Sequence, residues 1–261
     1  MEKASAIFGS IFGGAAAEPA ATVSSIFVYP IKSCRGISVS EAPITSTGLR
    51  WDRQWVVINS KGRAYTQRVE PKLALVEVEL PQNAFVEGWE PTNSSYLASE
   101  TRAVDPAYAH GYNTMFSDGY PFLLLSQGSL NALNELLREP LSVNRFRPNI
   151  LVDGCDPFLE DLWTEIKINK LTFNGVKLCS RCKVPTINQE NGIAGPEPTE
   201  TLMKFRSDKV LLPGRKHQGK VFFGQNLVCR ESLTQGKGKA IKVGDPVYIT
   251  KKVSSSADAA A

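Results

Sequence analysis

The sequence predicts a mainly β protein of the α+β class, built from β-barrels that carry a few short helices. Short runs of β-branched and aromatic residues, bounded by Pro, Gly or Asn, greatly outnumber helical patterns. Only the stretches 130–137 and 199–206 repeat apolar residues at helical spacing. The chain has no internal repeat, no GxGxxG fingerprint and no P-loop. Strands that so outnumber helices favour barrels.

The first third of the chain is predicted to contain strands separated by turns. Ser24–Tyr29 is a strand that stops at Pro30, and Gly36–Pro43 is a second one. Arg50–Ile58 and Ala64–Gln67 form a hairpin, and Leu73–Leu80 alternates apolar and acidic residues like a half-exposed strand. Residues 81–110 show no such pattern, which indicates a long loop or a domain boundary.

The rest of the chain adds further strands and the two helices. Pro121–Leu125 is a buried strand, and Ser126 or Ser129 caps the helix 130–137. Asn174-Gly175 predicts a tight turn between strands 167–173 and 176–178, since this dipeptide adopts positive φ angles readily. The other expected strands are 150–152, 163–168, 220–230 and 240–250.

Composition restricts the classes of partner. The chain has 261 residues and a formal net charge of +4, without a basic run or interleaved basic and aromatic residues. This favours an anionic small ligand over nucleic acid. Five cysteines at irregular spacing argue for a reducing intracellular compartment, cytoplasmic or mitochondrial. The Gly- and Ala-rich residues 1–22 are expected to be a flexible leader, too short and broken to span a membrane.

The segment Leu178–Gly192, LCSRCKVPTINQENG, holds the chain's one closely spaced cysteine pair, Cys179 and Cys182. Such a pair suits half of a zinc site, a redox dithiol, two structural thiols, or one thiolate that acts as nucleophile or metal ligand. A zinc site would need a second pair of ligands, and the sequence has no second paired motif. A redox dithiol motif normally lies at the start of a helix, whereas the pattern here stays strand and loop. The thiolate hypothesis gains from adjacent Arg181 and Lys183, whose charges would favour the anion.

Cations also follow strands elsewhere. Lys32-Ser33-Cys34-Arg35-Gly36 comes after the first strand and could offer charge and N–H groups to an anion, or be a surface turn. Arg53 shares a predicted strand face with Trp55 and needs an acid or a bound anion. Arg145 and Arg147 precede a buried strand and suggest the same.

Together these motifs resemble the MOSC family. They occur in the order VYPIKSCRG, WDRQWVVI, NRFRPNILVDGCDPFLEDLW, LCSRC, FFGQN and IKVGDPVY. The likeness is strongest to the amidoxime-reducing components and the C-terminal region of molybdenum cofactor sulfurases. It implies a MOSC N-terminal β-barrel domain over 23–100, shortened near 90–96, a MOSC β-barrel domain over 101–252, and a disordered tail over 253–261.

The resemblance also implies a molybdenum–molybdopterin cofactor between the two parts. Cys182 matches the family's protein ligand to molybdenum. The positions that match contacts to the pterin and its phosphate are Lys32, Ser33, Arg53, Arg147, Ser180, Arg181 and Asn226. Asn226 stands where amidoxime-reducing members carry an aromatic residue, and Gly119-Tyr120 replaces a Thr-Ser pair.

The expected function is reduction of small N-hydroxylated substrates, with electrons from a cytochrome b5-type donor and its reductase. The alternative is a carrier or sulfuration module for the cofactor, without turnover of its own. Full-length sulfurases carry a pyridoxal-phosphate domain, for which this chain has no room, so desulfurase activity is not expected.

Overall fold

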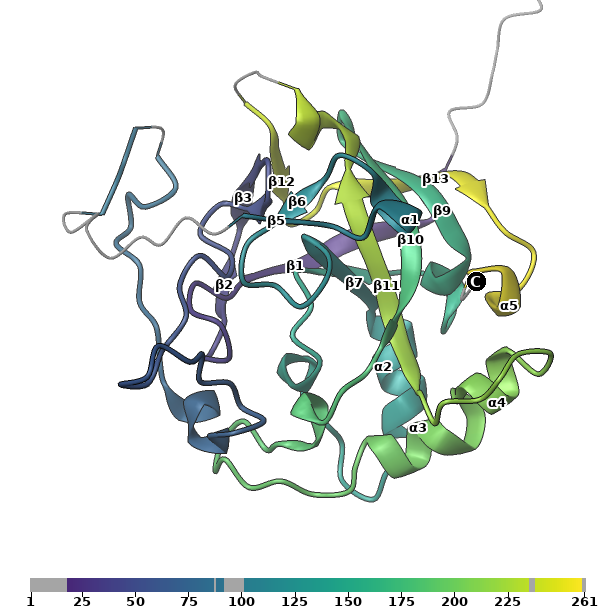
Figure 1. Ribbon diagram of the computed structural model, residues 1–261. Helices are drawn as coiled ribbons and strands as arrows, with labels where there is room; N and C mark the ends of the chain where they lie inside the picture. The colour runs from purple at the N-terminus through teal and green to yellow at the C-terminus, as the bar shows by residue number, and fades with distance from the viewer. Residues whose placement is uncertain (1–17, 87, 92–100, 235–237, 260–261) are drawn as a thin grey trace, which may run out of the picture.

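The computed structural model describes residues 18–86, 88–91, 101–234 and 238–259. The mainly β prediction is confirmed. Eight strands form one sheet in the order β13-β9-β10-β11-β7-β8-β1-β2, and β1 also pairs with β13, so that seven of them close a barrel (Figure 1). The barrel strands are β1 (Ala21–Val28), β7 (Phe122–Ser126), β8 (Ile150–Asp153), β9 (Trp163–Ile168), β10 (Leu171–Ser180), β11 (Phe222–Cys229) and β13 (Pro246–Lys252).

Strand β1 connects the two ends of the chain. It pairs with β8 through Ile26↔Ile150 and with β13 through Ala21↔Val247. The N-terminal region also contributes β2 (Ile37–Val39) to the large sheet, and β3 (Glu41–Thr45) and β4 (Gly48–Leu49) to a three-stranded sheet with β12 (Ala240–Lys242). The short strands β5 (Arg102–Ala103) and β6 (Asn113–Thr114) pair with each other. The described part of the chain thus closes around strands from both halves of the sequence.

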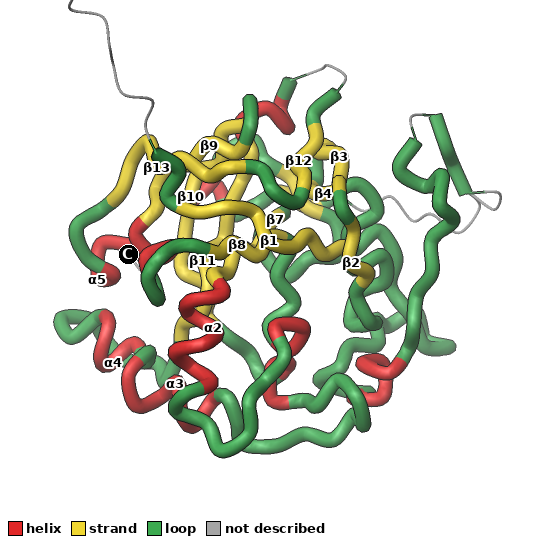
Figure 2. Tube along the Cα trace, turned by 180° about the vertical axis from the view of Figure 1, so that it is seen from behind, coloured by secondary structure: helices red, strands yellow, loops and turns green. Residues whose placement is uncertain are grey.

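Short helices cover one end of the barrel. Figures 1 and 2 show α2, α3 and α4 gathered there. An apolar cluster that includes Tyr29, Leu130, Phe146, Leu202 and Phe223 packs α2 and α3 against the barrel. The described helices are α1 (Pro106–Ala109), α2 (Gln127–Asn134), α3 (Thr199–Phe205), α4 (Asp208–Leu211) and α5 (Ser256–Ala259).

Two helix predictions can be compared directly. Helix α2 begins three residues before the predicted start, because Ser126 is the cap: its hydroxyl accepts from the backbone N–H of Ser129 at 3.0 Å. Helix α3 covers the expected stretch. The tail predicted to be disordered contains α5, whose Asp258 accepts hydrogen bonds from Ser254 and Ser255.

The N-terminal segments differ most from their predictions. The predicted hairpin over 50–58 and 64–67 is reduced to its tip, which keeps the isolated bridge Ile58↔Ala64 and backbone hydrogen bonds from Tyr65 to Val57 and from Asn59 to Arg63. Trp51 turns inward, 3% exposed, and its indole N–H donates to the carbonyl of Ala84. The start of the predicted strand 73–80 is instead part of the 3-10 helix η1 (Pro71–Leu75). Pro71 favours the first turn of a helix, and the helix buries Leu73 and Ala74.

The predicted turn at Asn174-Gly175 is wrong. Strand β10 runs unbroken through both residues, and the hairpin turn lies at Asn169-Lys170, between paired Ile168 and Leu171. Gly175 serves a different purpose. A Cβ there would lie 2.0 Å from the carbonyl oxygen of Trp163 and 2.8 Å from Nε2 of Gln225. The glycine therefore permits β9, β10 and β11 to approach closely just before β10 delivers the cysteine segment.

We expect Gly175→Ala to lower the free energy of unfolding by about 2–4 kcal/mol, because the added methyl group meets backbone rather than a movable side chain. Urea denaturation followed by circular dichroism measures it. Gly214→Ala is the matched control, since its Cβ would meet nothing within 4 Å. It should change stability by less than about 0.5 kcal/mol. Equal effects of the two substitutions would contradict the close-approach explanation.

Candidate functional site

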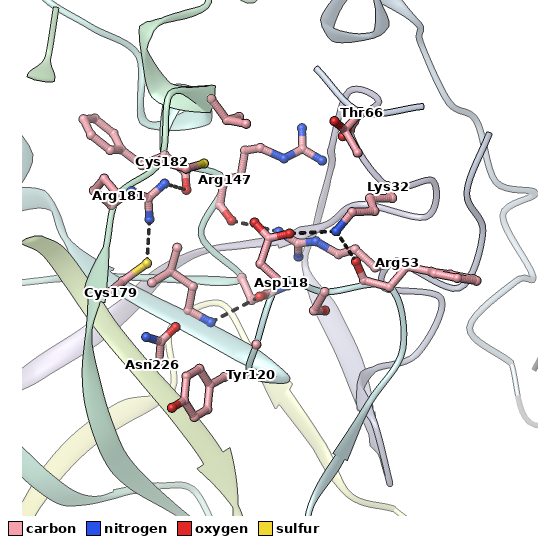
Figure 3. Close-up of a pocket in the computed structure, with 18 of the residues that line it drawn as sticks. Lys32, Arg53, Thr66, Asp118, Tyr120, Arg147, Cys179, Arg181, Cys182 and Asn226 are labelled. Carbon is pink, nitrogen blue, oxygen red and sulfur yellow. Dashed lines mark hydrogen bonds and ion pairs between the residues drawn. The ribbon is translucent and has the colours of Figure 1, made fainter. Parts of the chain in front are cut away.

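A pocket of about 370 Å³ opens where β10 ends, and all eight predicted site residues line it. Figure 3 shows Lys32, Arg53 and Thr66 on one side of it, Cys179, Arg181 and Cys182 on the other, and Asp118 and Arg147 between them. The predicted residues that line it are Lys32, Ser33, Arg53, Arg147, Ser180, Arg181, Cys182 and Asn226. Segments far apart in the sequence are thus brought to one place, while the roles of these residues remain predictions.

The end of β10 is fixed by its neighbour β11. Ser180 pairs with Phe222, and the backbone N–H of Arg181 donates to the carbonyl of Val221 at 2.8 Å. Cys182 follows directly, and the 3-10 helix η5 (Val184–Thr186) then turns the chain away. All five cysteines are free, and Cys179 and Cys182 are both partly exposed. A thiol on such an anchored turn has a defined position without being enclosed by core.

Arg181 contacts the other cysteine of the pair. Its Nη1 lies 3.1 Å from Sγ of Cys179, and its Nη2 donates to the carbonyl of Phe146 at 2.6 Å. Its Nε is buried and has no partner among the described residues. The guanidinium that was expected to favour a Cys182 thiolate is therefore held on Cys179, which lines the pocket as well.

Lys32 is bound to the pocket's acid. Its ammonium lies 2.7 Å from Oδ1 of Asp118 and donates to the carbonyl of Phe116 at 2.6 Å. The lysine side chain is 17% exposed and the aspartate 71%. Loss of solvent raises the pKa of Asp118, but the charge and hydrogen bond of Lys32, with more distant Arg53 and Arg68, outweigh this and leave the pKa below its usual value.

Tyr29 organises the arginines of the pocket. Its ring is fully enclosed, with the guanidinium of Arg53 at 4.2 Å from the ring centroid and that of Arg147 at 4.3 Å. Both distances are typical of cation–π contacts. Asp52 accepts from the Tyr29 backbone N–H at 2.9 Å and from Nη1 of Arg53 at 2.7 Å. The acid that Arg53 needed is therefore its own neighbour in the sequence.

Arg147 has no such acid. It is 9% exposed, donates through Nη1 to the carbonyl of Cys34 at 2.7 Å, and belongs to no ion pair within the described ranges. Its Nη2 is buried and has no hydrogen-bond partner in the part of the chain that the structure describes. Burial, followed by the nearby charge of Arg53, lowers the pKa of Arg147 to about 10. A buried cation with an unused donor is stabilised by a bound anion.

Three of the predicted residues have left-handed backbone. The φ angles are 70° at Ser33, 48° at Arg53 and 56° at Arg147. Non-glycine residues adopt this region at a cost of about 1–3 kcal/mol each, and such residues gather at functional sites. The surrounding contacts hold them there: the backbone N–H of Arg53 donates to the carbonyl of Tyr29, and the side chain of Gln67 donates to the carbonyl of Ser33.

Several lining residues were missed by the sequence analysis. Thr66 lies in the segment 64–67 that was predicted as a strand, Arg68 follows that segment, and nothing in the local pattern singles either of them out. Asp118 and Tyr120 lie just before β7, where the sequence analysis noted only that Gly119-Tyr120 replaces the family's Thr-Ser pair. Burial raises the pKa of Tyr120 to about 12, so its hydroxyl stays protonated at neutral pH.

The charges of the lining are unequal. Five cations, Lys32, Arg53, Arg68, Arg147 and Arg181, face one carboxylate, Asp118. No group of three or more Cys, His, Asp or Glu side chains able to hold a metal occurs in the described part of the chain. The zinc hypothesis therefore has no ligand set there. The pocket therefore has a positively charged lining that includes a pair of partly exposed thiols.

We expect Asp118→Asn to tighten the binding of inorganic phosphate about threefold, because Lys32 loses its internal competitor, and exposed pairs contribute up to about 1 kcal/mol. Isothermal titration calorimetry of cofactor-free protein at low ionic strength measures the dissociation constant. Glu79→Gln is the control, since Glu79 is exposed and lies outside the pocket lining. It changes the net charge by the same amount and should leave phosphate binding unchanged. Weaker binding by Asp118→Asn would contradict the competition.

Comparison with known proteins gives the family. The MOSC N-terminal beta barrel domain matches residues 20–108, and the MOSC domain matches residues 111–248. Mitochondrial amidoxime-reducing component 1 of Homo sapiens is 32% identical, over 87% of this chain and 82% of its own length. The protein of the same name from Xenopus laevis is 28% identical, over 88% and 82%.

A molybdenum cofactor sulfurase is also similar. The protein from Oryza sativa subsp. japonica is 28% identical over 87% of this chain, but the match covers 35% of its own length. No described helix is long and apolar enough to cross a bilayer. With both family domains present in order and a third of the residues shared with an amidoxime-reducing component, the chain belongs to the MOSC family.

Proposed function

We propose that the protein binds molybdenum–molybdopterin in the pocket at the end of β10 and reduces small N-hydroxylated compounds such as amidoximes. The observation that carries this proposal is the set of five cations around a free thiol on an anchored turn. The similarity to amidoxime-reducing components supports the class of reaction.

The residues fit such a cofactor. A soft thiolate suits a transition metal, and Cys182 would supply it, with Cys179 held by Arg181. The unpartnered donors Nη2 of Arg147 and Nε of Arg181 suit the negative charge of a pterin phosphate and its oxygen atoms. Lys32, Ser33, Arg53, Ser180 and Asn226 complete the proposed binding set.

The bound molybdenum would supply two-electron transfer to the N–O bond. Reduction of an N–OH group needs two electrons and two protons and releases water. The chain's contribution is to hold the cofactor and to place polar hydrogens at the pocket. The ammonium of Lys32, next to Asp118, is one such hydrogen donor. The positive charge of the lining would stabilise a bound anion. Phe116, Leu123 and Phe146 form apolar parts of the lining and exclude some water from it.

The proposed electron source is a cytochrome b5-type donor with its reductase. The resemblance to the amidoxime-reducing components suggests both proteins. Five free cysteines suit a reducing intracellular compartment, cytoplasmic or mitochondrial. Residues 1–17 of the predicted leader 1–22, and 92–96 of the stretch predicted to be shortened, lie outside the described residues. The end of the predicted leader is wrong, because Ala21 and Thr22 already belong to β1 and pair with Val247 and Pro246.

A second function is supported by the match to a sulfurase over 35% of that protein's length. Under this second hypothesis, the same pocket would hold the cofactor for delivery or sulfuration, and the protein would not reduce a substrate. Cofactor binding is common to both hypotheses, so turnover separates them.

Cys182→Ser should abolish stable molybdenum binding, because a hydroxyl is a much poorer ligand than a thiolate for this metal. Protein purified from a host that makes the cofactor is analysed for molybdenum by inductively coupled plasma mass spectrometry. Turnover of an aryl amidoxime is measured with a chemically reduced viologen. Wild type should contain close to one molybdenum per chain, and the variant less than about a tenth of that.

Cys155→Ser is the matched control, a half-buried thiol outside the pocket lining. It should keep both metal and turnover. Molybdenum and turnover both retained in Cys182→Ser would refute its role as ligand. Bound molybdenum with no amidoxime turnover in wild type would favour the carrier hypothesis over the reductase.

A further inference from the structure

The segment that supplies Thr66 and Arg68 to the pocket also forms its rim. We call residues 57–72 the rim hairpin. It exposes large apolar side chains that the fold does not cover: Val57 is 39% exposed, Ile58 58% and Val69 70%. Apolar groups exposed this strongly next to a pocket commonly mark a contact surface.

Free positive charge accompanies these apolar residues. The rim hairpin carries four exposed cations, Lys61, Arg63, Arg68 and Lys72, and one acid, Glu70. None of the four cations belongs to an ion pair in the described part of the chain, and the carboxylate of Glu70 instead accepts from the backbone N–H of Lys72. Nearby Arg35 differs, because it is paired with Glu77 at 2.9 Å. The positive charge of the rim is therefore available to a partner.

The rim hairpin is firmly attached to the pocket wall. The backbone N–H of Asn59 donates to the carbonyl of Arg63, and that of Tyr65 to the carbonyl of Val57. The side chain of Asn59 accepts from the backbone N–H groups of Lys61 and Arg63. Gln67 is fully buried and donates to the carbonyl of Ser33 at 2.7 Å. A partner that docks on this hairpin would therefore contact a rigid surface connected to the proposed cofactor loop.

We propose that the rim hairpin is the docking surface for an acidic protein that delivers electrons to the pocket. The inference rests on the proposed reductase function, which requires a donor to approach the pocket opening. Charge complementarity between a cationic rim and an acidic carrier would speed their encounter, and the exposed valine and isoleucine side chains would give the short-lived complex its apolar contact. A small contact of this kind suits a carrier that must leave after each electron.

Docking at the rim has a kinetic consequence. Because Thr66 and Arg68 belong to both the rim hairpin and the pocket lining, a docked protein would lie over the opening through which substrate enters. Donor and substrate should then use the site in turn. Initial rates measured at several donor concentrations should give parallel double-reciprocal lines.

The test is the double charge reversal Lys61→Glu with Arg63→Glu, both outside the pocket lining. The probe is the haem domain of a cytochrome b5, an acidic one-electron carrier. We expect the KM for this donor to rise at least tenfold at low ionic strength and to lose most of its salt dependence. Turnover with the small viologen reductant should stay within twofold of wild type, because a small molecule needs no docking surface.

Lys209→Glu with Lys216→Glu is the matched control, with the same charge change on exposed residues near α4. It should leave the KM for the donor unchanged. An unchanged KM in the rim variant, or an equal rise in the control, would overturn the docking surface. Absence of viologen turnover in wild type would instead refute the reductase function.

Direct binding keeps the inference testable even then. The dissociation constant of the haem domain is measured by titration calorimetry with wild type and both variants, and only the rim variant should bind at least tenfold more weakly. Co-sedimentation with phosphatidylserine vesicles is measured in parallel. Vesicle binding that is lost in the rim variant, with donor binding intact, would assign the surface to a membrane and overturn the proposal.

Discussion

The pocket depends on the packing of two guanidinium groups against one buried tyrosine. Tyr29 directly follows the first barrel strand, and Arg53 and Arg147 approach its ring from segments that are 94 residues apart. Asp52 fixes the arrangement by accepting from both the Tyr29 backbone and Arg53. Because Arg53 is already neutralised by this acid, the unsatisfied charge is that of Arg147. The cluster thus joins the N-terminal region to the barrel. It also leaves the charge of Arg147 without a counter-ion among the described residues.

Barrel closure supplies the other half of the site. Strand β10 pairs with β11 up to Ser180 and Phe222, so the position of Cys182 follows from the sheet rather than from loop packing. Gly175 permits the close passage of β10 past Trp163 on which this register depends. One side of the pocket is therefore set by strand pairing, and the other by side-chain contacts around Tyr29.

The sequence could predict the barrel strands and the site residues for different reasons. Strands such as β7, β9 and β11 have unbroken apolar or alternating patterns, because barrel burial repeats along each strand. The site residues came from cations next to strand ends and from the family resemblance.

The failures lie where local pattern and tertiary contact disagree. The indole of Trp51 turns inward and donates to the carbonyl of Ala84, and the alternating segment Leu73–Leu80 pairs with no strand in the part of the chain that the structure describes. Asn174-Gly175 has turn chemistry, but the close approach of Trp163 determines its use. Thr66 and Arg68 could not be predicted, because only the fold brings their loop to the pocket.

The left-handed backbone at Ser33, Arg53 and Arg147 has a consequence for how the protein could evolve. Glycine at any of these positions would relieve the local backbone strain, but it would also remove the side chain that the pocket presents, and at position 53 it would leave buried Asp52 without its ion-pair partner. Relief of this strain would therefore also remove contacts that the pocket can offer to a ligand. A lineage that retains non-glycine residues at all three positions records continued selection for what the pocket holds, independent of any assay of turnover.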